Sequence, residues 1–140
     1  MNDSILGLIG QGIETHNGIP DLKMIKEQAK PLLLILDDLM LNVKNNFLDL
    51  LFTRGSHNWN VSIIFVTQSL YGKDIKTARA NAHYLVLMRN PSGQLQTYNN
   101  ATSNQFSYLV INMHPNADEE FRLSSKIFPG EILEVYLPNE

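Results

Sequence analysis

The sequence predicts an α/β fold with a mainly parallel sheet flanked by helices, and three observations predict it. An unbroken aliphatic run, residues 32–36, ends in two adjacent carboxylates. A second apolar run, residues 61–66, ends in Thr67 and Gln68. Between them, residues 42–52 carry apolar side chains at helical spacing. Such spacing suits one right-handed strand–helix–strand unit, which brings the polar ends of both strands to the same edge of the sheet.

The first strand organises the prediction. Five aliphatic residues in a row are typical of a strand buried on both faces. Alternation places Asp37 and Asp38 on opposite faces where that strand ends. Ligand sites of open parallel sheets gather at this edge, and the pattern is that of a Walker B strand. A solvated, helix-capping pair of Asp residues is the plain alternative.

The N-terminal region carries little pattern, and we expect no stable element in residues 1–20. The glycines of residues 7–12 are not followed by the Gly-Lys-Ser/Thr ending of a phosphate-binding loop. Gly18 and Pro20 indicate a turn. Asp21 is a candidate helix cap for residues 22–30, and Pro31 ends that helix.

The rest of the chain contains shorter elements. Residues 53–60 are predicted to be a polar loop before the second strand. Residues 94–106 are polar and match neither period. The remaining expected elements are a short helix over 73–81, strands over 83–88 and 108–113, a helical turn over 118–123 and an edge strand over 132–137.

Composition limits the classes of function. A chain of 140 residues with 44% hydrophobic content suits one domain, residues 1–140. Its formal charge of −3 gives no global basic field, so contact with nucleic acid requires a local patch or loops in an oligomer. The absence of cysteine excludes disulfides and fits an intracellular protein. Asp3 near the start argues against a signal peptide, and no apolar run is long enough to span a membrane.

Several segments together resemble the FtsK–HerA-type DNA-packaging ATPases encoded by Polinton/Maverick elements and related large DNA viruses. The resemblance covers about residues 17–139. It rests on LDDLM (36–40), FTRGSH (52–57), FVTQ (65–68) and NAHYLVL (81–87), followed by YLVIN (108–112) and IFP (127–129). Two features depart from the family: no Walker A loop is present, and a helical stretch between Gln96 and Tyr98 is missing. The resemblance therefore implies the C-terminal half of a P-loop ATPase core of the ASCE/RecA-like type, from Walker B onward.

The same resemblance implies roles for four residues, with ATP and Mg²⁺ as cofactors. Asp37 would hold Mg²⁺ through water, Asp38 would orient the attacking water, and Gln68 would sense the γ-phosphate. Arg54 is the candidate arginine finger, with Arg79 and Arg89 as competitors. As alternatives, Gln68 is only the cap of a strand and Arg54 only a solvated loop residue.

The implied partners are double-stranded DNA held in an oligomeric ring, further copies of the chain, and capsid or other packaging proteins. Two other classes of function compete with the ATPase. One is a non-catalytic oligomerisation or interaction module, and the other is a degenerate remnant of a mobile element. His57 and His83 lack a second His or Cys at ligand spacing, so neither is expected to bind metal. Trp59 is expected to pack beneath the adjacent loop.

Overall fold

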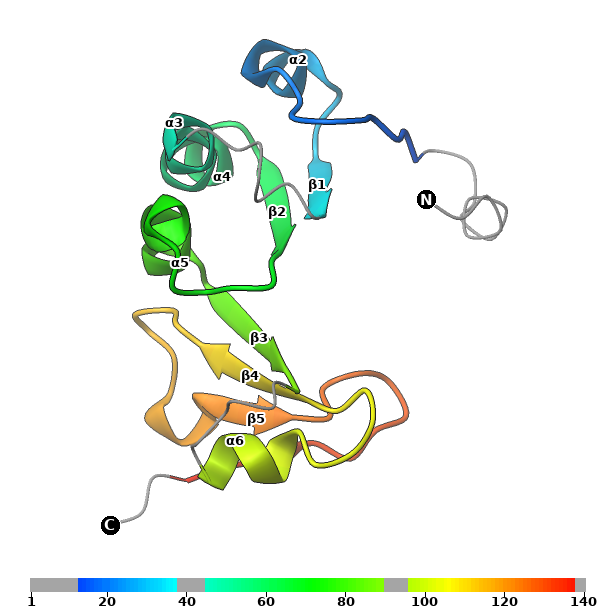
Figure 1. Cartoon of the computed structure of the whole chain (residues 1–140), viewed down its shortest axis with the longest axis vertical. Coiled ribbons are helices and arrows are strands. Elements are labelled where there is room, and N and C mark those ends of the chain that lie inside the picture. Colours follow the sequence, from blue (N-terminus) through cyan, green and yellow to red (C-terminus); the bar gives the residue numbers. More distant parts are fainter. Residues whose placement is uncertain (1–12, 38–44, 90–95, 138–140) are drawn as a thin grey trace. The chain divides into compact units, whose positions relative to one another are not determined.

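The computed structural model describes residues 13–37, 45–89 and 96–137, and the chain forms two compact units. Unit 1 comprises Met1–Ala78 and unit 2 comprises Arg79–Glu140. Each unit has its own sheet, drawn in Figure 1 as β1 with β2 and as β3 with its antiparallel neighbours. Residues 13–20 contain no helix or strand.

Unit 1 is built on two parallel strands. They are β1 (Leu32–Asp37) and β2 (Val61–Val66), paired in register from Leu32 opposite Val61 to Asp37 opposite Val66. This pairing confirms the predicted strand–helix–strand unit. The helical elements are α2 (Leu22–Glu27), α3 (Asn45–Leu50), the π-helical turn η1 (Leu51–Gly55), α4 (Ser56–Asn58), the 3-10 turn η2 (Lys73–Ile75) and α5 (Lys76–Asn81), whose last residues belong to unit 2.

Local chemistry explains the first helix. The Asp21 carboxylate accepts a hydrogen bond from the Lys23 backbone N–H at 2.9 Å, which satisfies one of the free donors at the start of α2. The cap is therefore confirmed. The helix ends at Glu27, before the predicted end, because Gln28 takes an extended backbone conformation.

The connection between the two strands corrects one prediction. Residues 53–60 were expected to be a loop, but η1 and α4 continue the helix to Asn58. The Thr53 and Ser56 hydroxyls donate back to the carbonyls of Asp49 and Phe52, which keeps these polar residues compatible with a helix. Gly55 leaves room here, because a Cβ would lie 3.0 Å from Leu51 and 3.2 Å from Trp59.

The two faces of the parallel pair differ. One face packs against the helices, with Leu48 and Leu51 as the largest fully buried side chains of the core. Trp59 is half-buried against this core, as expected, with the Lys26 ammonium 4.6 Å from its ring centroid. The other face has no such cover among the described residues: its exposed apolar side chains are Leu33 (56%), Ile35 (59%), Ile64 (48%) and Val66 (48%).

Unit 2 contains an antiparallel sheet in the order β3-β4-β5-β6. The strands are β3 (Tyr84–Met88), β4 (Tyr108–Asn112), β5 (Leu123–Ser125) and β6 (Glu134–Val135), with α6 (Gln96–Ala101) and the 3-10 turn η3 (Glu119–Phe121) between them. Tyr98 and Ala101 of α6 pack with Leu109 of β4 in the small core of this unit. The 73–81 helix, the turn near 118–123 and the final edge strand are confirmed, whereas α6 was not predicted.

The predicted fold class is wrong. The structure is mixed: a two-stranded parallel sheet and a four-stranded antiparallel sheet with few helices, and it is not a parallel-sheet P-loop core. Residues 113–122 and 126–133 connect consecutive strands and are too short for parallel crossovers with a packed helix. The apolar sequence of β3 suggested a strand of the parallel sheet. In the structure its side chains alternate between exposed and half-buried, as is typical of an antiparallel strand.

No helix in the described part of the chain is both long enough and apolar enough to cross a membrane.

Candidate functional site

The carboxyl edge of β1 and β2 is the candidate site that the sequence indicated. Asp37 is the last residue of β1 and its side chain is exposed, whereas Leu36 before it is buried on the helix-covered face. In the parallel register Asp37 lies opposite Val66. Gln68 follows Val66 by two positions along the chain. The described side chains at this edge therefore combine a carboxylate with the polar segment that follows β2.

A local turn fixes the segment after β2. The Thr67 hydroxyl donates to the Ser69 carbonyl at 3.0 Å and accepts from the Ser69 backbone N–H at 3.2 Å. Both bonds span two residues, so they bend the chain where the strand ends. Gln68 lies inside this turn and is exposed.

Asp38 lies outside the described residues, so its separation from Gln68 stays a prediction. Asp37 alone offers hard oxygen ligands in an exposed position, which suits Mg²⁺, an ion that keeps several waters and takes one or two carboxylates from the protein. Within the described ranges, no three His, Cys, Asp or Glu side chains gather as a ready metal cage. The donor set fits Mg²⁺ only in company with water and a phosphate.

Of the three candidate arginines, Arg54 belongs to unit 1 with this edge, and Arg79 and Arg89 belong to unit 2. Arg54 is exposed in η1, among the last helical turns before β2 begins. Because the helical connection returns the chain from the carboxyl edge to the amino edge, Arg54 lies nearer the amino ends of the strands than Asp37 does. Arg79 is half-buried in α5, and Arg89 follows β3 and is exposed.

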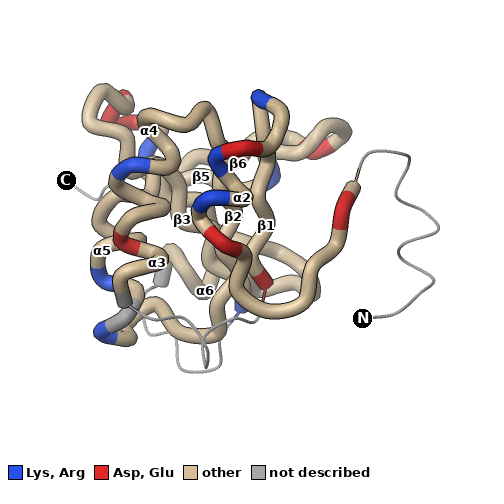
Figure 2. The backbone as a smooth tube through the Cα atoms, turned by 90° about the horizontal axis from the view of Figure 1, so that it is seen from above, with Lys and Arg blue, Asp and Glu red and all other residues tan. Residues whose placement is uncertain are grey.

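Charge along the chain is mixed. In Figure 2, α2 carries basic and acidic residues together, with Lys23 3.9 Å from Glu27 one turn later. The segment formed by η2 and α5 carries Lys73, Lys76 and Arg79 together with Asp74, so it is basic on balance. This segment is the only support in the described residues for a contact with nucleic-acid phosphates.

Two histidine rings lie close together in unit 2. The rings of His83 and His114 lie 5.6 Å apart between centroids. The Asn116 backbone N–H donates to Nδ1 of His114 at 3.2 Å. The expectation that His57 and His83 bind no metal stays a prediction.

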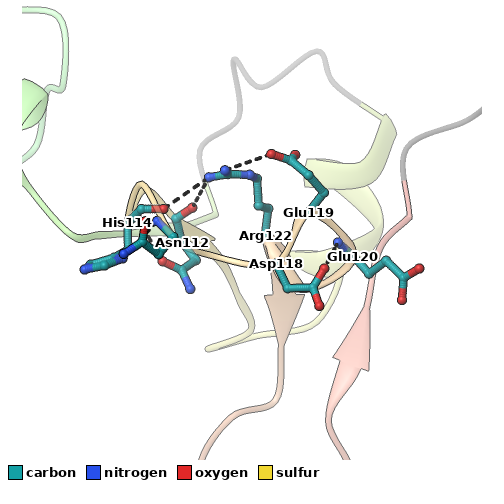
Figure 3. A network of polar contacts seen from close by, with 7 residues as sticks. Asn112, His114, Asp118, Glu119, Glu120 and Arg122 are labelled. Atoms are coloured by element: carbon teal, nitrogen blue, oxygen red, sulfur yellow. Dashed lines mark hydrogen bonds and ion pairs between the residues drawn. The ribbon is translucent and has the colours of Figure 1, made fainter.

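Unit 2 contains two polar networks that sequence reasoning missed. In Figure 3 the Arg122 guanidinium lies between the Glu119 carboxylate, at 2.8 Å, and the Asn112 backbone carbonyl, at 3.3 Å. These contacts tie η3 to the end of β4. The only sequence signal was Asp118, whose side chain caps η3 through the Glu120 N–H.

The second network anchors the loop between β5 and β6. The Tyr108 hydroxyl donates to the Glu131 carboxylate at 2.7 Å and accepts from the Ile127 N–H at 2.9 Å. Burial, followed by this bond to Glu131, raises the pKa of Tyr108. The same bond and the Phe128 N–H lower the pKa of the Glu131 carboxyl. Tyr108 and Glu131 are 23 positions apart, so no local sequence pattern predicts their hydrogen bond.

The neighbouring pair Lys126 and Glu134 forms an ion pair that raises the lysine pKa and lowers the glutamate pKa. Both networks join residues across turns, and the second joins the buried Tyr108 to the exposed Glu131. Their arrangement fits a structural role.

No protein-family model, no curated protein and no solved structure matches the chain.

Proposed function

We propose that this chain supplies the acid-bearing strand pair of an ATP-hydrolysing site in a DNA-translocating, genome-packaging motor. One observation carries the proposal: β1 and β2 pair in parallel with Asp37 opposite Val66, so the Asp37 end of β1 lies beside the end of β2 that leads into Thr67 and Gln68. The sequence resemblance adds the identity of the motor. A virus- or transposon-encoded protein of this kind acts inside the host cell.

The division of labour follows from the residue types. Asp37 holds Mg²⁺, whose positive charge neutralises charge that develops on phosphate oxygens. Asp38 orients and polarises the attacking water, and Gln68 contacts the γ-phosphate through its amide. Arg54 serves a nucleotide bound by a neighbouring copy, where a guanidinium stabilises charge on the transferred phosphoryl group.

The phosphate-binding loop comes from outside these 140 residues. Most phosphate affinity in ATPases of this kind comes from backbone N–H groups and a lysine, and the chain has no Gly-Lys-Ser/Thr segment to provide them. The chain by itself is therefore expected to hydrolyse ATP at no more than the background rate.

The test joins the chain to a segment that supplies a Gly-Lys-Ser/Thr phosphate-binding loop and measures Mg²⁺-dependent ATP hydrolysis. Asp38→Asn should abolish turnover and leave nucleotide binding nearly unchanged, whereas Asp37→Asn should raise the Mg²⁺ concentration needed. Glu27→Gln, an exposed acid on α2, is the matched control. Robust hydrolysis by the chain alone, or normal turnover of the joined Asp38→Asn protein, would falsify the proposal.

A second candidate is a non-catalytic assembly module. The uncovered apolar face of β1 and β2, with Ile35 beside Ile64, favours it, because parallel sheets are ordinarily covered on both faces. Association of the chain that is insensitive to Asp37→Asn, without any nucleotide binding by the joined protein, supports this candidate over the ATPase.

A further inference from the structure

Strand β3 of unit 2 has one paired edge and one open edge. In the described ranges its sheet order places it first, with β4 as its neighbour. The Met113 N–H donates to the His83 carbonyl at 2.8 Å, and these two residues face each other in the register that pairs Tyr84 with Asn112. Hydrogen-bonded pairs alternate along antiparallel strands. The backbone groups of Tyr84, Val86 and Met88 therefore point away from β4.

Part of this outer edge is already used. The Tyr98 hydroxyl donates to the Met88 carbonyl at 2.7 Å, which confirms that this carbonyl points away from β4. The N–H and C=O groups of Tyr84 and Val86 remain directed outward, together with the N–H of Met88. They have the spacing that an added strand requires.

The side chains at the same positions are apolar and exposed. Tyr84 is 61% exposed, Val86 57% and Met88 60%, and all three lie on one face because they alternate along the strand. Natural edge strands are usually protected from pairing by charged residues, proline or a bulge. Residues 84–88 have no charge and no proline, and their register with β4 is unbroken.

The charged residues that flank this strand in the sequence of unit 2 are basic. Residues 79–89 contain Arg79 and Arg89 but no Asp or Glu. Arg89 directly follows β3 and is exposed. A segment that paired with β3 would gain from a carboxylate placed near Arg89, since charge-assisted hydrogen bonds to a guanidinium are strong.

We propose that the outer edge of β3 binds an extended segment of another polypeptide, with apolar side chains at alternate positions and an acidic residue that meets Arg89. Main-chain hydrogen bonds to Tyr84 and Val86 provide affinity, and the exposed side chains select apolar partners. A second copy of β3 is a poorer occupant, because antiparallel pairing about Val86 would bring the two basic flanks together. This inference does not depend on the proposed ATPase function.

The experiment titrates a synthetic peptide into the nitrogen-15-labelled full chain and follows amide shifts. The peptide alternates valine with threonine and has a glutamate at each end. We expect shifts centred on Tyr84, Val86 and Met88. Val86→Pro removes one outward N–H without touching the β4 ladder, and should weaken binding at least tenfold. Ile132→Lys, which changes an exposed apolar residue outside the strands, should leave binding unchanged.

Two further arms keep the test decisive if Val86→Pro disturbs folding. Methylating alternate amides of the peptide should abolish binding to the unchanged protein. Replacing its glutamates with lysine should weaken binding several-fold, and Arg89→Glu should reverse that preference. Absence of shifts on β3, or shifts that survive amide methylation, would overturn the proposal. Dimerisation of the chain alone that Val86→Pro abolishes would make a second copy the occupant and would equally overturn it.

Discussion

The two sheets differ in the contacts that cover and stabilise them. Unit 1 packs one face of a parallel strand pair on a helical core, and no described residue covers the other face. Unit 2 packs a small antiparallel sheet against α6 and has polar networks across its turns. This difference between the units follows from the residues that each one contains. Long apolar runs give unit 1 its strands, and scattered Tyr, Glu and Arg side chains tie unit 2 together.

The comparison also separates what could be predicted. The cap at Asp21 could be predicted because it depends on neighbours along the chain. The parallel pairing of 32–36 with 61–66 could be predicted because a helical segment between two apolar runs indicates a right-handed crossover. Strand direction in unit 2 was not, since the register of β3 with β4 depends on contacts between residues about 20 to 28 positions apart. For the candidate site, the sequence named Asp37 and Gln68, but their relation follows only from the register of β1 with β2.

The largest expected effect tests whether unit 1 owes its stability to the covered face alone. Leu48→Ala removes a side chain that is 1% exposed and should lower the free energy of unfolding by about 3 kcal/mol. Leu33→Ala on the open face should cost less than about 1 kcal/mol. Denaturant unfolding monitored by Trp59 fluorescence measures both. Equal losses would mean that the open face is covered in solution.

The next effect tests the polar closure of unit 2. Tyr108→Phe removes the hydroxyl that bonds Glu131 and Ile127, and should cost about 1–3 kcal/mol because one of the two lost bonds is to a charged carboxylate. Hydrogen exchange should show faster exchange at the Ile127 and Phe128 amides. If exchange there is unchanged, the network does not hold the loop.

A smaller effect probes the start of unit 1. Asp21→Ala removes the cap of α2 and should cost about 1 kcal/mol. Asp21→Asn retains an oxygen acceptor and is the matched control. The helical signal in circular dichroism and the unfolding midpoint together report the loss, which the control should restore almost fully.

The smallest expected effect is a pH dependence of the loop that Glu131 stabilises in unit 2. The pKa of Glu131 is lowered in the folded chain, so its contribution to stability is present above the ordinary carboxyl range and is lost as the pH falls through its folded pKa. Acid should therefore loosen the loop after β5 in the unchanged chain more than in Glu131→Gln, which lacks this titration. Amide exchange of Phe128 against pH measures it. Identical profiles would contradict the assignment.

The most direct test of the central claim asks whether a divalent ion and nucleotide meet at the carboxyl edge of β1 and β2. Mn²⁺ substitutes for Mg²⁺ and broadens nearby amide signals, so a titration of the joined protein, which has a phosphate-binding loop, with Mn²⁺ and ATP locates the ion. The account predicts broadening centred on Asp37, Thr67 and Gln68, lost in Asp37→Asn and kept in Glu27→Gln. Broadening elsewhere only, or broadening at this edge that Asp37→Asn leaves unchanged, would contradict it.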